Sequence, residues 1–506
     1  MNNKGSRSDQ LPGEYRIHTA ASVLTTLDDS SISRFHLRAM LTSGMGFFTD
    51  AYDLFIIGVV LSILTPIWHL NPFQVSLLGS TSLIAAAFGS IIFGRLADHV
   101  GRKSIYGHTL IVLAIGAVAS AFSPNVIWLL VFRFILGLGI GGDYPLSATL
   151  MSEYANRRDR GKLVTMVFSM QAVGLILGPL VALGLLLAGI DHGLVWRIML
   201  ALGAVPALAT YYLRLRIAET PRFALAMQGD LAGATQTVDF VTNGRVTNNQ
   251  NGHKSAMSPT TALQARNGNG AQKKAAPVKS WLYVLLQPRY MRWLIGTAGA
   301  WFLLDIAYYG TTISSPLVLK SLNSHASLVT NMLYTLIIFV VAALPGYIVA
   351  AFTIDRLGRK WIQCFGFAMM TLAYGLLAVA PALTTLTLPF LLIYGTSYFF
   401  TEFGPNVTTF VYPAEIFPVM VRTTAHGIAA AVGKVGAFIG AFAFPFLLAN
   451  FHLPGAMAFA ACVSLIGLLL TLFTLPEPNQ RSLEDISDEH AVRAAHEERE
   501  LVASGS

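Results

Sequence analysis

The sequence is poor in charged residues for its length. Asp, Glu, Lys and Arg make up only 12% of its 506 residues, whereas 54% are hydrophobic. A soluble domain carries roughly 25% charged residues, so these charges could not cover a water-exposed surface of this size. The composition excludes an ordinary soluble protein and indicates an integral membrane protein.

Cysteine is nearly absent as well. Cys364 and Cys462 both lie in apolar runs, which excludes a disulfide framework and leaves no cluster of soft metal ligands. Residues 1–36 contain no short apolar segment followed by a cleavage site, so we expect no signal peptide. No nucleophile triad or ligand set points to an enzyme, and we expect neither a metal nor a cofactor.

Long hydrophobic runs, in contrast, fill most of the chain. A membrane-spanning helix needs about 20 largely apolar residues. Twelve stretches qualify, at about 39–66, 74–97, 105–122, 126–148, 163–188, 195–215, 290–318, 329–352, 362–380, 386–412, 424–449 and 455–475. We therefore expect an all-α polytopic membrane protein with twelve transmembrane helices.

The basic residues predict the orientation of these helices. Nearly all Lys and Arg residues lie in the N-terminal segment, in alternate loops and in the C-terminal tail. By the positive-inside rule both termini are then cytoplasmic, in a plasma membrane or a bacterial inner membrane. The net charge of +8 is explained by this topology, and we expect no nucleic-acid partner.

The same reading divides the chain into five parts. We expect a cytoplasmic N-terminal segment, a six-helix half, a cytoplasmic linker, a second six-helix half and a cytoplasmic tail. Their bounds are 1–38, 39–215, 216–289, 290–475 and 476–506. The linker can form a short surface helix after Glu219. The rest of it is rich in Asn, Gly, Ala and Lys and nearly free of aromatics, so we expect it to be largely disordered.

An internal repeat supports two related halves. GRLADHVGRK (94–103) is echoed by AFTIDRLGRK (351–360), with Asp98 and Asp355 at equivalent positions 257 residues apart. A second pair, Glu153…Arg160 and Glu415…Arg422, keeps the same internal spacing. Duplicated halves around an axis normal to the membrane are one plan of secondary transporters, with the binding site between the halves.

Seven ionisable residues are predicted to lie at membrane depth, away from the ends of the spans. They are Asp50, Asp53, Arg133, Asp143, Asp305, Glu402 and Lys434. Ionisable groups at membrane depth are costly and are functional candidates by default. Five acids against two bases leave an excess of three negative charges, so static salt bridges cannot account for all the acids.

Several of these residues lie in segments that resemble a known family. GRLADHVGRK resembles the loop motif of the major facilitator superfamily. Four further segments closely match the inorganic phosphate:proton symporter family within it: GMGFFTDAYDLF (44–55), GGDYPLSATLMSEYANRRDRG (141–161), WFLLDIAYYG (301–310) and FGPNVTTFVYPAEIFP (403–418), continued by HGIAAAVGK (426–434). The resemblance covers about residues 38–475. It implies the major facilitator fold and a symporter that imports inorganic phosphate with protons by alternating access.

The resemblance also implies the residues of the phosphate site. These are Tyr144, Gln171, Trp301, Asp305, Tyr309 and Asn406, with Lys434 close by. Phenols, amides, an indole N–H and an ammonium all donate hydrogen bonds, which suits a tetrahedral oxyanion. For Tyr308 we expect only packing or a place in the interfacial aromatic belt.

The loop motifs are implied to be the gate. Charge contacts there would lock the cytoplasmic side in one state, although the same residues could simply be solvated loop charges. The gating candidates are Asp98, Arg102, Lys103, Glu153, Arg160, Asp355, Arg359, Glu415 and Arg422. We expect Glu153 and Arg160 to form salt bridges with Arg422 and Glu415.

An excess of buried acids would repel an anionic substrate unless protons neutralise some of them. Two unit charges 4 Å apart interact by about 4 kcal/mol at an effective dielectric constant of 20. We therefore expect Asp305 to bind both substrate and proton. Asp50 and Asp53 are the expected pair for proton uptake, with Arg133 stabilising whichever of them ionises. Asp143 would pair with Arg133 or control access to the site.

Glu402 departs from the family pattern, in which Asn is common at this position. It is an additional proton site or it shifts substrate preference, and the sequence leaves both readings open. Two alternative functions also remain: proton-coupled transport of an organic phosphate or another organic anion, and a phosphate-sensing receptor. We expect the partners to be inorganic phosphate, protons and the lipid bilayer, and the protein to function as a monomer.

Overall fold

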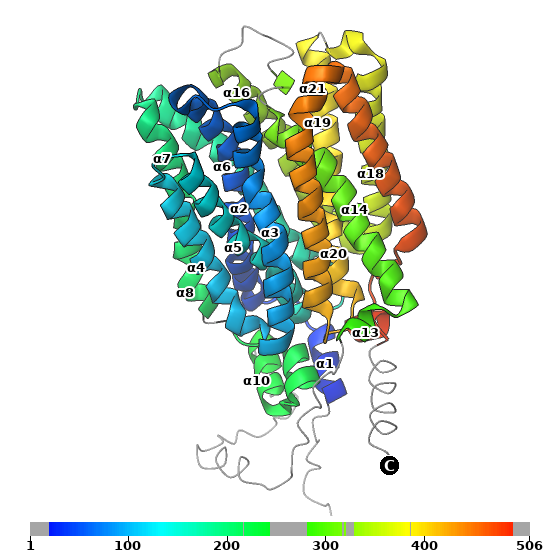
Figure 1. The fold of residues 1–506 in the computed structure, drawn as a ribbon. Helices are drawn as coiled ribbons and strands as arrows, with labels where there is room; N and C mark the ends of the chain where they lie inside the picture. Colours follow the sequence, from blue (N-terminus) through cyan, green and yellow to red (C-terminus); the bar gives the residue numbers. More distant parts are fainter. Residues whose placement is uncertain are drawn as a thin grey trace, which may run out of the picture.

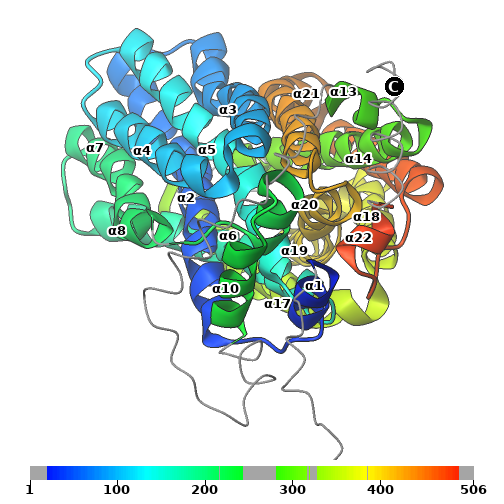
Figure 2. The ribbon, with the colours of Figure 1, turned by 90° about the horizontal axis from the view of Figure 1, so that it is seen from below.

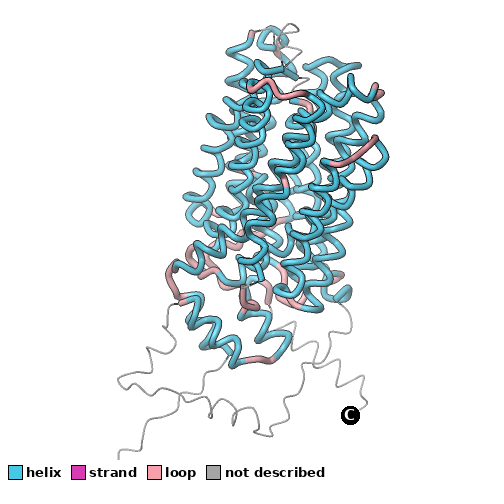
Figure 3. The backbone as a smooth tube through the Cα atoms, turned by 90° about the vertical axis from the view of Figure 1, so that its left-hand side faces the viewer, coloured by secondary structure: helices cyan, strands magenta, loops and turns pink. Residues whose placement is uncertain are grey.

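The computed structural model describes residues 20–215, 217–242, 281–315, 318–319, 328–384 and 386–488, and the regular elements in these ranges are all helical. The helices form two bundles that stand side by side (Figure 1). The smooth tube in Figure 3 shows the same elongated bundle, with a smaller group of short helices below it.

The first bundle contains six crossings. They are α2 (Arg34–Trp68), α3 (Pro72–Val100), α4 (Arg102–Ala121), α5 (Val126–Tyr154), α6 (Arg160–Leu187), and α7 (His192–Leu202) continued by α8 (Ala204–Leu215). Polar residues at the tight connections cap the helices that follow. Asn71 caps α3 by accepting a hydrogen bond from the Gln74 N–H (2.8 Å), and Asn125 caps α5 in the same way.

The second bundle contains the other six crossings, several of them interrupted. They are α14 (Pro288–Ile313), α16 (Leu328–Ile338) with η2 (Phe339–Ala343) and α17 (Leu344–Leu357), α18 (Arg359–Val379), α19 (Thr387–Phe403) with α20 (Pro405–Ile416), and α21 (Arg422–Thr474), which holds two crossings. The short 3₁₀ helix η3 (Pro381–Thr384) follows α18. Gly404 separates α19 from α20, and His452 has a non-helical backbone inside α21.

Twelve crossings result from this arrangement. In the part of the chain that the structure describes, nine helices are long and apolar enough to span a bilayer by length and composition. The α19–α20 pair and α14 add two more, and α21 counts once although it turns at His452. The predicted all-α architecture with twelve transmembrane helices is therefore confirmed.

Short helices gather at one end of the bundle, which we call the basic end because both loop motifs lie there. They are α1 (Ala20–Asp28), α9 (Pro221–Phe223), η1 (Ala224–Gln228), α10 (Leu231–Val241), α13 (Trp281–Leu285) and α22 (Leu483–Ile486). The structure describes residues 217–242 of the predicted linker, which contain α9, η1 and α10, and residues 281–287, which contain α13. Residues 243–280 lie outside the described residues. Residues 489–506 of the predicted tail lie outside them as well.

The two halves meet along helices from both sides. Seen from below, α3 of the first half packs against α21 of the second, and α6 packs against α17 (Figure 2). Near the basic end the contact between α3 and α21 is made by glycines. A Cβ added at Gly94 would lie only 3.2 Å from the Gly427 Cα, so the backbones touch with no side chain between them.

Candidate functional site

Lys434 is the centre of a polar cluster between the halves. Its Nζ donates hydrogen bonds to the phenol oxygens of Tyr144 (3.0 Å), from α5 of the first half, and Tyr309, from α14 of the second. The ammonium also lies 4.4 Å from the centres of both rings, a cation–π arrangement. The nearest carboxylate oxygen, Asp305 Oδ2, is 3.8 Å away, beyond hydrogen-bond distance.

Asp305 is itself incompletely paired. It is buried, and its Oδ2 has no hydrogen-bond partner. Trp301 lies one helical turn before it on α14, with its ring centre 6.0 Å from that of Tyr144. A Cβ at Gly433 would be 2.7 Å from the indole ring, so this glycine makes room for Trp301. The structure therefore brings Trp301, Asp305, Tyr309 and Lys434 together.

A chain of hydrogen bonds extends from Tyr144 across the interface. Tyr144 donates to Asp50 Oδ2, and Gln171 Nε2 donates to the Tyr144 oxygen (3.2 Å). Tyr347 of α17 donates to Gln171 Oε1 (3.0 Å) and accepts from Asn406 Nδ2 (2.9 Å). The candidate binding residues of both halves thus belong to one network.

Aromatic rings enclose this network. Phe47 and Phe410 contact the Tyr144 ring edge-on, and Phe168 stacks on Phe410 with ring centres 4.6 Å apart. All seven side chains of the implied phosphate site have exposed fractions of 4% or less. The cluster is consequently closed to solvent, and its polar groups act in a medium of low dielectric constant.

Two other buried acids are fully paired, which corrects the charge count. Arg133 donates two hydrogen bonds to Asp53 (3.1 and 2.9 Å). Asp143 pairs with Arg214 of α8 and not with Arg133. Arg214 is fully buried, although its position at the end of the sixth span is typical of a positive-inside residue. The prediction of two buried bases is therefore wrong, and three bases face five acids.

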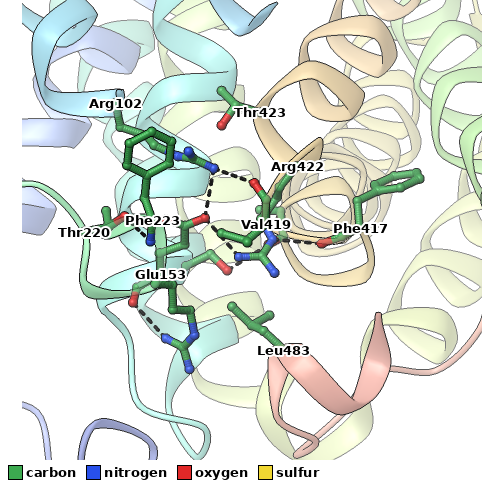
Figure 4. A network of polar contacts seen from close by, with 12 residues as sticks. Arg102, Glu153, Thr220, Phe223, Phe417, Val419, Arg422, Thr423 and Leu483 are labelled. Atoms are coloured by element: carbon green, nitrogen blue, oxygen red, sulfur yellow. Dashed lines mark hydrogen bonds and ion pairs between the residues drawn. The ribbon is translucent and has the colours of Figure 1, made fainter. Parts of the chain in front are cut away.

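The first loop motif joins the halves at the basic end. Asp98 accepts hydrogen bonds from the backbone N–H groups of Thr423 (3.3 Å) and Thr424 (2.6 Å), at the start of α21. It also pairs with Arg102 (3.1 Å). Arg102 in turn donates to the Val419 carbonyl (2.7 Å) in the other half (Figure 4).

Glu153 is the shared anion of this junction. It pairs with Arg102 (3.3 Å) and with Arg422 of the other half (3.0 Å), and it accepts a hydrogen bond from the Thr220 hydroxyl (2.5 Å). The close view shows both guanidinium groups directed at its carboxylate (Figure 4). The expected pairing of Glu153 with Arg422 across the halves is present.

The second loop motif repeats most of these contacts. Asp355 accepts from the backbone N–H groups of Gly161 (3.0 Å) and Lys162 (2.7 Å), at the start of α6. Arg359 pairs with Asp355 (2.9 Å) and Glu415 (2.8 Å). The expected pair of Arg160 with Glu415 is not formed.

Arg160 is held instead by segments outside the two bundles. It lies 3.5 Å from Asp28, at the end of α1, and donates to the Arg481 carbonyl (3.1 Å). Lys103 does not join the junction through its exposed side chain. Its backbone N–H donates to Glu219 (3.3 Å), whose pKa is raised by burial.

Some residues of these networks were not singled out by sequence. Tyr347 bridges Gln171 and Asn406, yet its only signal was a phenol in an otherwise apolar span. Arg222 pairs with Asp28 (2.6 Å) and Glu484 (2.8 Å). No sequence pattern indicated these pairs, because Asp28 lies in the predicted N-terminal segment and Glu484 in the predicted C-terminal tail. In the described ranges, no group of three or more His, Cys, Asp or Glu side chains could hold a metal ion.

Comparison with known proteins shows to which family this architecture belongs. Two duplicated six-helix bundles with a polar cluster between them define a membrane transporter of the major facilitator fold. A family model described as "Sugar (and other) transporter" matches residues 39–490. The chain therefore belongs to this family of the major facilitator superfamily.

Relatives and a solved structure agree with this family. The chain is 37% identical, over 92% of its length and 96% of the relative's, to "Probable inorganic phosphate transporter 1-6" of Arabidopsis thaliana. It is 36% identical, over 93% and 97%, to "Inorganic phosphate transporter 1-1" of Oryza sativa subsp. japonica. The proton:xylose symporter XylE bound to 6-bromo-6-deoxy-D-glucose matches with a TM-score of 0.71 at 21% identity, covering 90% of this chain and 99% of that one. This last similarity shows the fold alone.

Proposed function

We propose that this protein imports inorganic phosphate together with protons by alternating access. The named relatives support the substrate, and the environment of Lys434 carries the proposal. Arg133 and Arg214 are each bound closely to a carboxylate, whereas Lys434 contacts only phenol oxygens within hydrogen-bond distance. Its charge is therefore available to an anion that enters between the halves.

The groups around Lys434 suit a small tetrahedral oxyanion. Tyr144 and Tyr309 present hydroxyls from the two halves, and the amides of Gln171 and Asn406 belong to the same network. Charge-assisted hydrogen bonds to phosphate oxygens from such donors are among the strong ones in proteins. The tight burial of all these side chains favours a small anion over a bulky organic one.

Protons enter the mechanism because the unpaired charges around the site are mostly negative. After the two tight ion pairs are set aside, three buried acids remain, Asp50, Asp305 and Glu402, against one buried base, Lys434. A phosphate among three ionised carboxylates would be repelled by about 4 kcal/mol for each charge at 4 Å. Protonating Asp305 removes its attraction for Lys434, which then binds the anion. Loss of that proton restores the competition and releases phosphate.

The contacts at the basic end correspond to one state of the cycle. The site is buried while Asp98, Glu153 and Asp355 hold the halves together, so these bonds must break for substrate to leave toward the basic end. We assign this end, and both chain termini, to the cytoplasm of a cell membrane because the basic loops lie there. The unit of transport is one chain, since both halves of the site come from it.

The test is uptake of labelled phosphate into proteoliposomes that contain the full chain. We expect accumulation when the outside is more acidic and only equilibration when the pH values match. Asp305→Asn should abolish pH-driven accumulation but keep exchange of phosphate for phosphate, because Asn resembles the protonated acid. Asp485→Asn, an exposed acid on α22, is the matched control and should behave as the unmodified protein.

Two results would contradict the proposal. Equal accumulation with and without the pH gradient would exclude proton coupling. A glycerophosphodiester that competes better than inorganic phosphate would assign the site to an organic phosphate instead.

A further inference from the structure

Glu402 is a buried acid without an ion-pair partner in the part of the chain that the structure describes. It lies at the end of α19, two residues before the break at Gly404, and is fully buried. Its Oε2 accepts a hydrogen bond from Asn406 Nδ2, and its Oε1 has no hydrogen-bond partner. Within the described ranges, only Asp305 Oδ2 is another buried carboxylate oxygen without a partner. Asp305 has Lys434 at 3.8 Å, whereas no ion pair with a described residue reaches Glu402.

The groups that face Glu402 do not compensate its charge. They are the phenols of Tyr308 from α14, Tyr347 from α17 and Tyr374 from α18, and the amide of Asn406 from α20. The helices α16, η2 and η3 carry no charged residue in their sequences. The charged residues of α17, α18 and α20 all lie at the basic end of these helices: Asp355, Arg356, Arg359, Lys360 and Glu415.

An isolated buried carboxylate is costly, and binding a proton removes most of that cost. The arrangement therefore favours a neutral Glu402 in the closed site. Hydroxyls continue from its neighbours toward the end opposite the basic end. Tyr398 bonds Thr312 (3.0 Å), and Ser315 bonds Thr335 (3.4 Å). Thr312 belongs to α14, Tyr398 to α19 and Thr335 to α16, and Ser315 follows the end of α14. These hydroxyls lie between Glu402 and the end opposite the basic end, so they offer a route for a proton from that side.

The direction of the hydrogen bonds connects Glu402 to the anion site. The two N–H groups of Asn406 are both used, one by Glu402 and one by the Tyr347 oxygen. Tyr347 in turn donates to Gln171. While Glu402 is ionised, Asn406 has no N–H to offer to an anion. A protonated Glu402 is a weaker acceptor and itself a donor, so one N–H of Asn406 becomes free.

We infer that Glu402 is a second proton-binding carboxyl, whose protonation releases the Asn406 amide to bind the anion. Each transported anion then carries one proton more than a chain with an amide at this position would carry. This inference rests on the proposed phosphate symport and adds a carrier to it. Asn406 acts as the link, and Tyr347 positions it.

The experiment measures the limiting accumulation ratio of labelled phosphate in proteoliposomes of the full chain, with the voltage held at zero by potassium and valinomycin. Each coupled proton multiplies this ratio about tenfold per pH unit of gradient, since one pH unit corresponds to about 1.36 kcal/mol. Glu402→Gln keeps an acceptor for Asn406 but cannot bind the proton. Its ratio should be about tenfold lower than that of the unmodified protein at a gradient of one pH unit.

Two further variants control for packing. Glu402→Asp keeps a carboxyl and should keep the original ratio, and an equal loss there would overturn the inference because the loss would follow side-chain size. If Glu402→Gln does not insert in the membrane, Glu402→Met has similar length, needs no hydrogen bond and should show the same tenfold loss. An unchanged ratio in either charge-free variant would overturn the inference while leaving symport intact. Absence of pH-driven uptake in the unmodified protein would instead contradict the proposed function itself.

Discussion

Asp98 of the first loop motif and Asp355 of the second make equivalent contacts in opposite directions. Each accepts two hydrogen bonds from the backbone N–H groups that begin a helix of the other half, α21 for Asp98 and α6 for Asp355. A carboxylate at a helix N-terminus is favoured both by the unpaired N–H groups and by the helix dipole. Each aspartate is also paired with an arginine four residues later.

The two junctions differ in how their glutamates are used. Glu153 pairs across the halves with Arg422 (3.0 Å), whereas Arg160 contacts Asp28 and the Arg481 carbonyl in place of Glu415. Asp98 is fully enclosed, but the Asp355 side chain is 16% exposed. The first junction thus joins the bundles directly, while the second depends on the segments before α2 and after α21. The two copies of the motif thus share the geometry of their aspartates but differ in the segments that their other charged residues contact.

The largest effect should come from Glu153→Gln. This change leaves Arg102 and Arg422 buried beside each other without their shared anion, and breaking a buried ion pair costs about 3–5 kcal/mol. Thermal unfolding in detergent, followed by tryptophan fluorescence, should show a large loss of stability. Glu415→Gln is the matched variant and should cost less, because Arg359 keeps Asp355 and Asn479. Equal losses would show that the two junctions are energetically equivalent.

A smaller effect is expected from Asp98→Asn. A hydrogen bond to a charged group contributes about 1.5–3 kcal/mol, so losing the charge should favour separation of the halves at the basic end. A cysteine introduced at Ser90 in a cysteine-free background should then react faster with a thiol reagent. Asp355→Asn should raise this reactivity less, because water already reaches its carboxylate. A larger effect of the second variant would reverse the comparison.

The segment after α21 contributes a pH-dependent contact at the basic end, where Glu484 pairs with Arg222 (2.8 Å). Burial alone would raise the pKa of Glu484, but the charges of Arg222 and Arg422 outweigh it and lower the pKa from 4.5 to about 2. Its ionised form therefore stabilises the folded protein above about pH 4.5, and this contribution is lost as the pH falls toward 2. In Glu484→Gln the melting temperature should fall less steeply between pH 5 and pH 3. Parallel profiles would exclude this contact as an acid-sensitive one.

The smallest effect is expected from Lys103→Ala. The side chain is exposed and only its backbone N–H is bonded, and substitutions of this kind usually change stability by less than about 0.5 kcal/mol. Uptake and melting temperature should both remain close to those of the unmodified protein. A marked loss of transport would instead support the predicted gating role of the Lys103 side chain.

The fold was predictable because its signals are long and regular. Apolar runs, capping residues such as Asn71 and Asn125, and the repeat of Asp98 at Asp355 each determine structure through local chemistry. The helix break at Gly404 was harder to place, since a bilayer tolerates such a break when neighbouring helices satisfy the backbone. The break at His452, in contrast, falls between two of the predicted spans. Span ends also differ, with α2 beginning at Arg34 and not at residue 39.

The residues of the candidate site could be expected to lie together, but the partners of the buried charges could not. Lys434, Tyr144 and Tyr309 were expected near one another from the resemblance, and the structure brings them into contact. Arg214 was missed because a basic residue at a helix end has the same sequence pattern whether it faces water or turns inward to Asp143. Arg160 shows the converse, since its pairing depends on Asp28, in a segment with no periodic signal that links it to the bundle.

The contact of Gly94 with Gly427 has a consequence for how the protein moves. Side chains can change rotamer to follow a neighbour that shifts, but two bare backbones cannot. A small rotation of one bundle therefore breaks the contact of Gly94 with Gly427, whereas an interface made of side chains could adjust and stay in contact. We therefore expect this contact to favour separate arrangements of the two bundles over graded intermediates between them, because closely packed interfaces are bistable rather than continuously deformable.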